Sequence, residues 1–245
     1  MSSTSDEEEY YLPQLHEEHL FPSAREASEE GLVAFGGDLN PHRILEAYKG
    51  GIFPWYGPED PILWWSPNPR LVLFPQNFKK SKSFRRVLRN KGFEVCFDRA
   101  FESVISHCSA LPREGQEGTW LSSEMKRAYI ELHKMGFAHS VETYYEGELV
   151  GGLYGLAIGK GFFGESMFSL MSDASKVSLY ALSDICVKKS YDFIDCQVET
   201  AHLVKWGAQL IERNDFLDVL EKTLEKNTDS GSWRNWCWKY SEDME

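Results

Sequence analysis

The sequence lacks the features of a membrane or secreted protein. No uninterrupted apolar run approaches the roughly 20 residues that a membrane helix needs. The opening MSSTSDEEEYY has neither a basic nor an apolar segment, so a signal peptide is not expected. The five cysteines, at positions 96, 108, 186, 196 and 237, are odd in number and include no CxxC pair. These features argue against a disulfide framework or a zinc ribbon and favour a reducing cytoplasm.

The sequence also lacks the motifs of the common cofactor and metal enzymes. It contains no GxxxxGK[ST] loop, no HExxH pair and no GxGxxG turn after a predicted strand. Its seven histidines show no metal-ligand spacing. Nucleotide hydrolysis and zinc chemistry are therefore disfavoured.

Positive charge is scarce overall but concentrated in one segment. The 245 residues have a net charge of −12, and residues 1–30 account for −8 of it, with nine acids and one arginine. The rest of the chain therefore carries only −4. Seven positive charges and no acid fall within residues 79–91: Lys79, Lys80, Lys82, Arg85, Arg86, Arg89 and Lys91. Such a segment either binds a polyanion locally or forms a solvated helix face.

Apolar residues (42%) and aromatics (14%) are abundant enough for a packed core. Residues 1–19 are predicted to be a flexible acidic tail. The first predicted domain, 20–110, contains a Trp- and Pro-rich segment and the basic helix, with helices at 42–49, 81–91 and 99–108 and strands at 71–74 and 93–97. A second domain, 111–245, follows the loop 109–119. Its predicted helices are 122–135, 173–187, 200–206 and 215–225, and its predicted strands are 138–145, 148–158, 161–164, 192–197 and 208–212. This order indicates an α+β fold with a largely antiparallel sheet.

Two short strand segments carry polar side chains in apolar surroundings. Alternation along a strand puts Asp195 and Gln197 on one face and Cys196 on the other. A buried acid and amide need partners, so they are either functional or a structural hydrogen-bonded pair. The same alternation puts Glu165 and Met167 on one face. Glu165 then lies either at the polar mouth of an apolar pocket or at a strand end where its carboxylate faces water. Cys196 with His202 is a weaker candidate for a nucleophile pair.

Tryptophans in irregular segments offer a further kind of site. Most tryptophans pack in a core. A tryptophan near a basic patch can instead stack on a nucleobase. Trp55 and Trp120 are the candidates for that role because both lie in predicted irregular segments.

Several long stretches resemble the leucyl/phenylalanyl-tRNA–protein transferase family. They are FGGDLNPHRILEAYKGGIFPWY, PILWWSPNPRLVLFP, EGTWLSSEMKRAYIELHKMGFAHSVE, ELVGGLYGLAIGKGFFGESMFS, DASKVSL and IDCQVETAHLVKWGA. The resemblance implies transfer of Leu or Phe, and weakly Met, from aminoacyl-tRNA to the N-terminal Arg or Lys of an acceptor protein, which marks that protein for N-end-rule degradation. It also implies a C-terminal domain of the N-acetyltransferase superfamily, a smaller N-terminal α/β domain, and no metal or coenzyme A.

The same resemblance gives roles to residues of this sequence. Asp195 and Gln197 match the catalytic pair, and Trp55 and Trp120 match the platforms for the terminal adenosine. Glu165 lies at the polar edge of the aminoacyl pocket and is grouped with the catalytic residues. The pocket itself matches Leu153, Met167, Leu179, Leu182, Cys186 and Ile194. The basic helix, 79–91, is the expected tRNA contact.

Two other functions remain possible at the level of the sequence. An acyl-coenzyme A N-acetyltransferase would share the fold, but it normally needs a Q/R-x-x-G-x-G/A loop. The segment before the predicted helix 173–187 reads SLMSDAS and has no such loop. A non-catalytic tRNA-binding module would keep the basic helix and the tryptophans without needing Asp195 or Gln197.

Overall fold

A seven-stranded mixed sheet forms the centre of the molecule, in the order β11-β5-β10-β9-β8-β7-β6. The computed structural model describes residues 12–16, 20–110 and 122–241. Neighbouring strands are antiparallel except β9 and β10, which are parallel. The strands are β5 (Arg70–Leu73), β6 (Glu94–Phe97), β7 (Ala138–Tyr145), β8 (Glu148–Ile158), β9 (Gly161–Ser169), β10 (Phe193–Gln197) and β11 (Gln209–Ile211). The expected α+β fold with a largely antiparallel sheet is confirmed.

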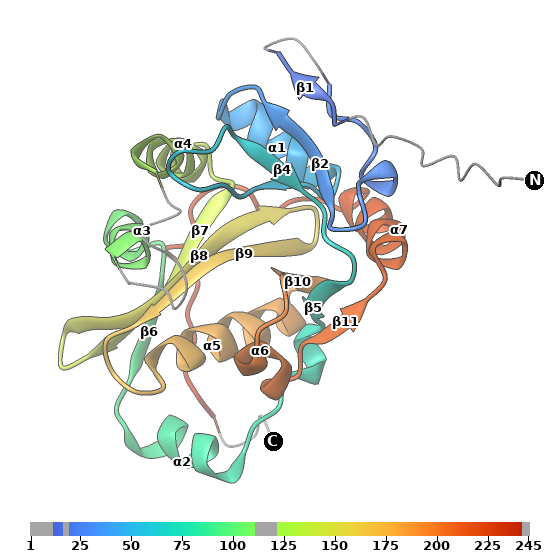
Figure 1. Ribbon diagram of the computed structural model, residues 1–245. Helices are drawn as coiled ribbons and strands as arrows, with labels where there is room; N and C mark the ends of the chain where they lie inside the picture. The colour runs from blue at the N-terminus through green and yellow to red at the C-terminus, as the bar shows by residue number, and fades with distance from the viewer. Residues whose placement is uncertain (1–11, 17–19, 111–121, 242–245) are drawn as a thin grey trace, which may run out of the picture.

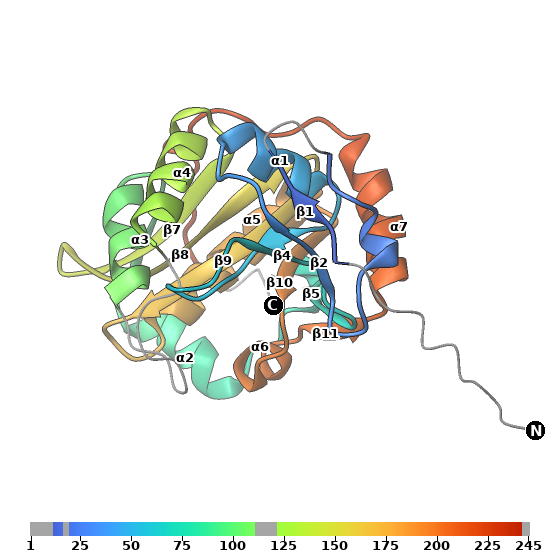
Figure 2. The same cartoon turned by 45° about the horizontal axis from the view of Figure 1, so that its top comes forward.

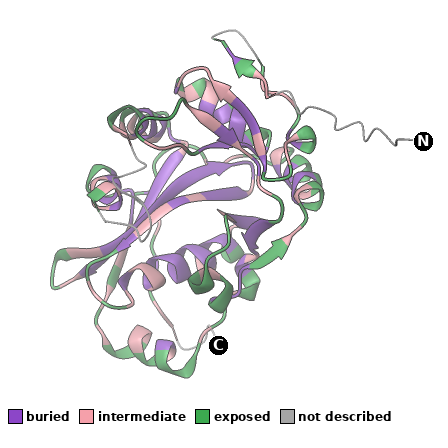
Figure 3. Ribbon diagram, viewed as in Figure 1, coloured by how far each residue is buried: buried purple, intermediate pink, exposed green. Residues whose placement is uncertain are grey.

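Helices cover both faces of this sheet (Figures 1 and 2). One face packs against α1 (Pro41–Lys49), α3 (Phe101–Ala110), α4 (Ser123–Lys134) and α7 (Arg213–Leu224). The other packs against α5 (Ala174–Lys188), with α2 (Lys82–Asn90) beneath it and the short α6 (Ala201–Lys205) beside it. The sheet interior is buried, whereas α2 and α6 are largely exposed (Figure 3).

A small sheet lies against the first face, in the order β1-β2-β4-β3. Its strands are β1 (Gln14–Leu15), β2 (Leu32–Gly36), β3 (Phe53–Pro54) and β4 (Leu63–Trp65), and short 3-10 helices span Ala24–Glu26 and Pro75–Asn77. Part of the predicted tail therefore belongs to the fold, because β1 pairs with β2 and Leu15 is buried. Residues 1–11 and 17–19 lie outside the described residues.

The predicted domain boundary at 110/111 does not coincide with the division between the sheets. Strands β5 and β6 come from the predicted first domain but pair with β10 and β7 of the second. The small sheet ends at Trp65 and the large sheet begins at Arg70. The division between the two sheets therefore lies between Trp65 and Arg70. The predicted loop 109–119 does not mark it, because strands that are distant in sequence pair with one another across that loop.

Local signals fix most helix ends where the sequence predicts them. Asn40 caps α1 by accepting a hydrogen bond from the His42 amide, and Pro41 occupies the first turn. Ser122 caps α4 in the same way. Gly51 joins α1 to β3 with φ +73°, and a Cβ there would lie 2.4 Å from Leu217 of α7. The positive φ favours glycine here, and a Cβ would also force the tip of the Leu217 side chain to move.

Residues 225–241 form a segment that the sequence does not predict to be packed. The Trp233 ring stacks on buried His139 of β7 at 3.7 Å between centroids, and the Trp236 ring stacks on Trp233 at 3.9 Å. Asp98 accepts hydrogen bonds from the Trp233 amide and from His139. These contacts hold the C-terminal segment on the α5 side of the sheet.

Candidate active site

A cleft of about 1190 Å³ opens where β9 and β10 separate. The two strands pair from Phe193 opposite Gly161 to Asp195 opposite Phe163, and no further. Each strand is irregular just beyond this point: the β8–β9 register shifts at Tyr154/Gly155 and the β5–β10 register shifts at Asp195/Gln197. Side chains of β9, the first half of α5 and residues 194–206 line the cleft, and Trp55 closes one side.

Asp195 is fully buried beside an arginine that the sequence analysis did not single out. Arg70 of β5 donates to both carboxylate oxygens of Asp195, at 2.9 and 2.6 Å, and it is 1% exposed. Its third contact is with the Gly51 carbonyl, at 3.2 Å. The guanidinium lies between the rings of Phe53 and Phe216, with 4.8 and 4.7 Å to their centroids. The charge of Asp195 is thus neutralised by a bidentate pair inside the protein.

Gln197 lies at the end of β10 in an unusual conformation. Its φ is +61°, which is rare for a residue other than glycine. The Gln197 amide N–H donates to Asp195 Oδ1 at 2.9 Å. The side-chain nitrogen donates to Glu165 Oε1 at 2.8 Å. The nitrogen end of the amide faces Glu165, which is the orientation that an ionised carboxylate requires because it only accepts hydrogen bonds, and the oxygen is left for the cleft.

Glu165 is buried in a network of hydroxyl groups. The hydroxyls of Tyr48 and Tyr129 donate to its oxygens, the second at 2.7 Å, and contact each other at 2.8 Å. Burial raises the pKa of Glu165 to about 7. The hydrogen bonds from Tyr48, Tyr129 and Gln197 oppose that rise by favouring the ionised form.

One expectation about β9 is wrong. The sequence places Glu165 and Met167 on the same face, but Glu165 contacts the tyrosines of α1 and α4, whereas Met167 packs on the α5 side. The register shift between Tyr154 and Gly155 inserts one extra residue into β9, which reverses the alternation beyond it. The corresponding expectation for Asp195, Cys196 and Gln197 is met, because Cys196 packs on the α5 side.

The apolar part of the cleft contains five of the six predicted pocket residues. Leu153, Met167, Leu179, Leu182 and Ile194 line it. Cys186 does not: it is buried one turn further along α5, in the core of that face.

Burial raises the pKa of Cys196, and the charge of Asp195 adds to the rise, so this thiol is a poor nucleophile.

Trp55 lines the cleft and is 37% exposed, so part of its ring can be reached by a ligand. The Trp65 indole donates to the Trp55 carbonyl at 2.6 Å, and the two rings meet edge to face. Trp120, the second predicted platform, lies outside the described residues.

Helix α2, which carries most of the basic segment, lies below α5 (Figure 1). Phe84 of α2 packs against Tyr180 of α5. Lys176 of α5 lines the cleft, with its ammonium 4.2 Å from the Phe84 ring centroid and 5.4 Å from that of Trp206. Burial lowers the pKa of Lys176. Lys79, Lys82, Arg86 and Arg89 are exposed. Lys80, Arg85 and Lys91 are partly buried, with Lys80 bonded to Tyr180 and Lys91 to the Ser172 carbonyl.

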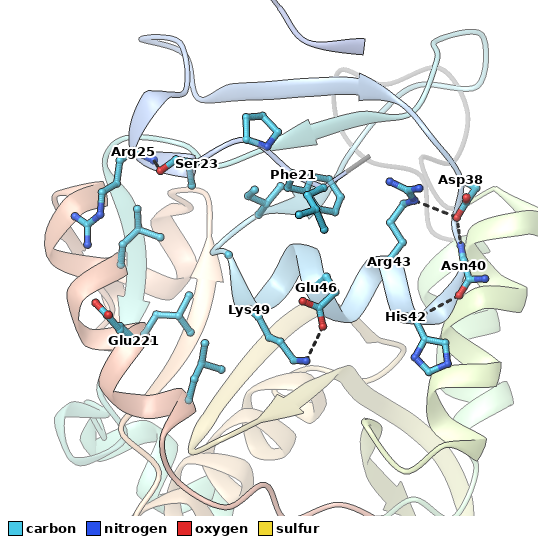
Figure 4. Close-up of a pocket in the computed structure, with 18 residues that line it drawn as sticks. Phe21, Ser23, Arg25, Asp38, Asn40, His42, Arg43, Glu46, Lys49 and Glu221 are labelled. Carbon is cyan, nitrogen blue, oxygen red and sulfur yellow. Dashed lines mark hydrogen bonds and ion pairs between the residues drawn. The ribbon is translucent and has the colours of Figure 1, made fainter. Parts of the chain in front are cut away.

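A second hollow, of about 790 Å³, lies between residues 20–25, α1 and α7 (Figure 4). Its charged residues are partly paired within it, as in the contacts of Arg43 with Asp38 and Lys49 with Glu46. None of the predicted site residues lines it.

Within the described ranges, no cluster of His, Cys, Asp or Glu side chains could hold a metal ion. In the same ranges, no helix is long and apolar enough to span a membrane.

Comparison with known proteins assigns this chain to a family. A family model described as leucyl/phenylalanyl-tRNA protein transferase matches residues 72–221, and a model of the N-terminal domain of that family matches residues 37–68. A leucyl/phenylalanyl-tRNA–protein transferase of Nitratidesulfovibrio vulgaris strain DP4 is 52% identical over 215 residues, covering 88% of this chain and 92% of the relative. One of the same name from Syntrophus aciditrophicus strain SB is 50% identical over 214 residues, covering 87% and 90%.

These matches define an enzyme, an aminoacyltransferase. The chain belongs to the leucyl/phenylalanyl-tRNA–protein transferase family. The two family models meet between residues 68 and 72, where the small sheet gives way to the large one. Among solved structures, a ribosomal-protein-alanine N-acetyltransferase from Brucella melitensis covers 60% of this chain and 99% of its own, at 10% identity and a TM-score of 0.33. A score this low carries no argument, and the fold is defined by the strand order above.

Three residues of the site were missed by sequence reasoning: Arg70, Tyr48 and Tyr129. Arg70 does leave a signal, because it is the single charged residue in the apolar run RLVLF. A charge at the start of a buried strand needs a partner, and the buried Asp195 is the natural complement. The tyrosines give no comparable signal, since each lies in a helix of mixed polar and apolar residues, at a position that fits an ordinary core.

Proposed function

We propose that this enzyme transfers Leu or Phe, and Met less well, from aminoacyl-tRNA to the N-terminal Arg or Lys of an acceptor protein. The product would be a protein tagged in the cytoplasm for N-end-rule degradation. The observation that carries the proposal is the fixed amide of Gln197, whose oxygen is left facing a cleft with an apolar pocket and an accessible tryptophan. Family membership favours this function over the acyl-coenzyme A and binding-module alternatives.

The reaction needs little from the protein beyond placement of the reactants. The donor is an ester, and the nucleophile is an α-amino group with an ordinary pKa of about 7.7–8.0, so a useful fraction is neutral at pH 7. The amine nitrogen forms a bond to the ester carbonyl carbon, and the bond from that carbon to the ribose oxygen breaks. In this proposal the Gln197 oxygen accepts a hydrogen bond from the amine and directs its lone pair toward the ester.

Asp195 acts in this scheme through the backbone. Its carboxylate is 0% exposed and is bonded to Arg70 and to the Gln197 amide N–H. It therefore has no free edge for the substrate. Asp195 is a positioning residue that holds Gln197 in its left-handed conformation, while Glu165 orients the side-chain amide.

The donor and the tRNA occupy different ends of the proposed site. The five apolar side chains of the pocket would hold the Leu or Phe side chain, and discrimination of one methylene in such a pocket is only about 1–3 kcal/mol, which agrees with acceptance of Met. Trp55 would stack on the terminal adenine. The exposed cations of residues 79–91 would contact tRNA phosphates.

The direct test measures transfer of radiolabelled Leu or Phe from charged tRNA to a peptide with N-terminal Arg. Peptides with N-terminal Lys and N-terminal Ser serve as the second substrate and the control. Gln197→Ala should slow transfer about 10²-fold, the loss expected when a reacting group is no longer held in position. The affinity for charged tRNA should stay nearly unchanged, because the amide contacts the acceptor amine. Loss of tRNA binding in step with transfer would contradict the assignment.

A further inference from the structure

The carboxyl group of Glu165 and the hydroxyls of Tyr48 and Tyr129 contact one another in a closed ring. Tyr48 contacts Glu165 Oε1, Tyr129 contacts Glu165 Oε2 at 2.7 Å, and the two hydroxyl oxygens are 2.8 Å apart. The three groups come from β9, α1 and α4. Both tyrosines are 0% exposed, whereas Glu165 is 9% exposed and lines the cleft.

A count of protons distinguishes two states of this ring. Each hydroxyl carries one hydrogen, so with Glu165 ionised two hydrogens serve three contacts, and the contact between the tyrosines is left without one. With Glu165 protonated, three hydrogens serve three contacts: Glu165 donates to Tyr48, Tyr48 to Tyr129, and Tyr129 back to Glu165. Conversion of the first state to the second takes one proton on Glu165 and a rotation of the Tyr48 hydroxyl toward Tyr129, and no heavy atom has to move.

The surroundings of the ring supply no cation to fix the ionised state. In the part of the chain that the structure describes, no lysine or arginine pairs with Glu165. The other polar groups that face the ring are the Tyr154 hydroxyl of β8, the Gln197 amide nitrogen, and Asp195. Asp195 is neutralised by Arg70. Burial raises the pKa of Glu165 to about 7, so both states of the ring are populated near neutral pH.

We propose that the Glu165–Tyr48–Tyr129 ring is the proton store of the transfer reaction, taking up the proton of the attacking amine and returning it to the leaving ribose oxygen. This inference rests on the proposed function. It assigns a step that Gln197 cannot perform, because a primary amide does not hold a proton near neutral pH.

The steps balance without any further reactant. The neutral amine forms the C–N bond, and its nitrogen becomes positively charged as the carbonyl oxygen becomes negative. One N–H proton passes to the ionised Glu165, which then donates within the ring. When the carbonyl re-forms and the C–O bond to the ribose breaks, the ribose oxygen takes that proton. The products are an amide and a free ribose hydroxyl, and Glu165 is ionised again.

Infrared spectroscopy of the full-length enzyme without substrates tests the ring directly. The carbonyl band of a protonated carboxyl group, isolated as wild type minus Glu165→Gln, should disappear with rising pH, with a midpoint near 7. Tyr129→Phe should move the midpoint up, because it removes a donor that favours the ionised form. Glu142→Gln is the matched control: Glu142 is also buried with a raised pKa, but it is not among the residues that line the cleft. The proposal would be overturned if the band did not titrate between pH 5 and 9, or if Tyr129→Phe left the midpoint of its titration unchanged.

Single-turnover transfer at several pH values gives the second readout. Wild type should speed up as pH rises through the titration of Glu165 and then through that of the acceptor amine. Glu165→Gln should be slower by about 10²-fold and retain only the rise from the amine. Glu142→Gln should follow wild type. If Glu165→Gln transfers at the wild-type rate with the same pH profile, the proton store is refuted and the proposed function stands. If wild type transfers nothing to peptides with N-terminal Arg or Lys, the proposed function fails instead, whatever the infrared titration shows.

Discussion

Removal of Arg70 should destabilise the protein far more than removal of a surface arginine with an equally short ion pair. Arg70 pairs with Asp195 at 2.6 Å, with side chains 1% and 0% exposed. Arg25 pairs with Asp218 at 2.5 Å, with side chains 42% and 59% exposed. Both are arginine–aspartate pairs of nearly equal shortest distance, but the Arg70 pair is buried and bidentate, whereas the Arg25 pair is exposed and has a single contact.

The magnitudes follow from what each truncation leaves behind. Arg70→Ala leaves the Asp195 carboxylate buried without its cation, which typically costs about 3–5 kcal/mol. For a chain of this size that corresponds to a fall in melting temperature of roughly 6–20 °C. Arg25→Ala leaves Asp218 in water and should cost about 0–1 kcal/mol.

Urea unfolding followed by tryptophan fluorescence and by circular dichroism measures both variants. A double variant, Arg70→Met with Asp195→Leu, separates stability from catalysis: it removes the buried charges together and should recover most of the lost stability. It should not recover transfer, because the Gln197 backbone N–H has lost the Asp195 carboxylate that accepts its hydrogen bond. An Arg70→Ala variant within about 1 kcal/mol of Arg25→Ala would refute the assignment of a desolvated pair.

Other predictions address the tRNA contact, the junction before β3 and the C-terminal segment. Arg86→Ala should weaken tRNA binding and reduce the slope of log affinity against log salt by about 1, and an unchanged slope in a salt titration would remove this residue from the contact. Gly51→Ala should lower the unfolding free energy by about 1–3 kcal/mol more than Gly92→Ala, because both have positive φ but only Gly51 lacks space for a Cβ. Burial lowers the pKa of His139 despite its bond to Asp98, so the folded protein keeps His139 neutral and should lose stability as pH falls below about 6.5. Denaturant unfolding at pH 7.5 and 5.5 should show this loss, and it should grow in Asp98→Asn, because the carboxylate of Asp98 favours the protonated form of His139.

The sequence predicts the long helices and the strands of the large sheet because local chemistry determines them, but it gives no bounds for the four strands of the small sheet. Caps at Asn40 and Ser122, the glycine stop after α4 and the alternation in β7 and β8 each act within a few residues. The division into sheets was not predictable in the same way. Strands β5 and β6 pair with partners more than 40 residues away in the chain, and no local signal states which strand they will join.

The site shows the same contrast. The polar pattern of β10 identifies Asp195 and Gln197 without a structure. Their partners are distant: Arg70 precedes Asp195 by 125 residues, and Tyr48 precedes Glu165 by 117. The register shift in β9 adds a further difficulty, since one inserted residue moves Met167 to the face opposite Glu165, and strict alternation does not predict this.

The irregularities of β9 and β10 are what make the cleft possible. A regular continuation of the parallel pair would join the two backbones beyond Asp195 and leave no space between them. The Gln197 amide N–H instead bonds to the Asp195 side chain, and the left-handed conformation of Gln197 ends the strand there. Such a conformation costs about 1–3 kcal/mol and persists only where its surroundings over-determine it. Here the surroundings are the buried pair of Arg70 and Asp195 on one side and Glu165 on the other, so the same contacts that hold the strands apart also aim the amide into the opening.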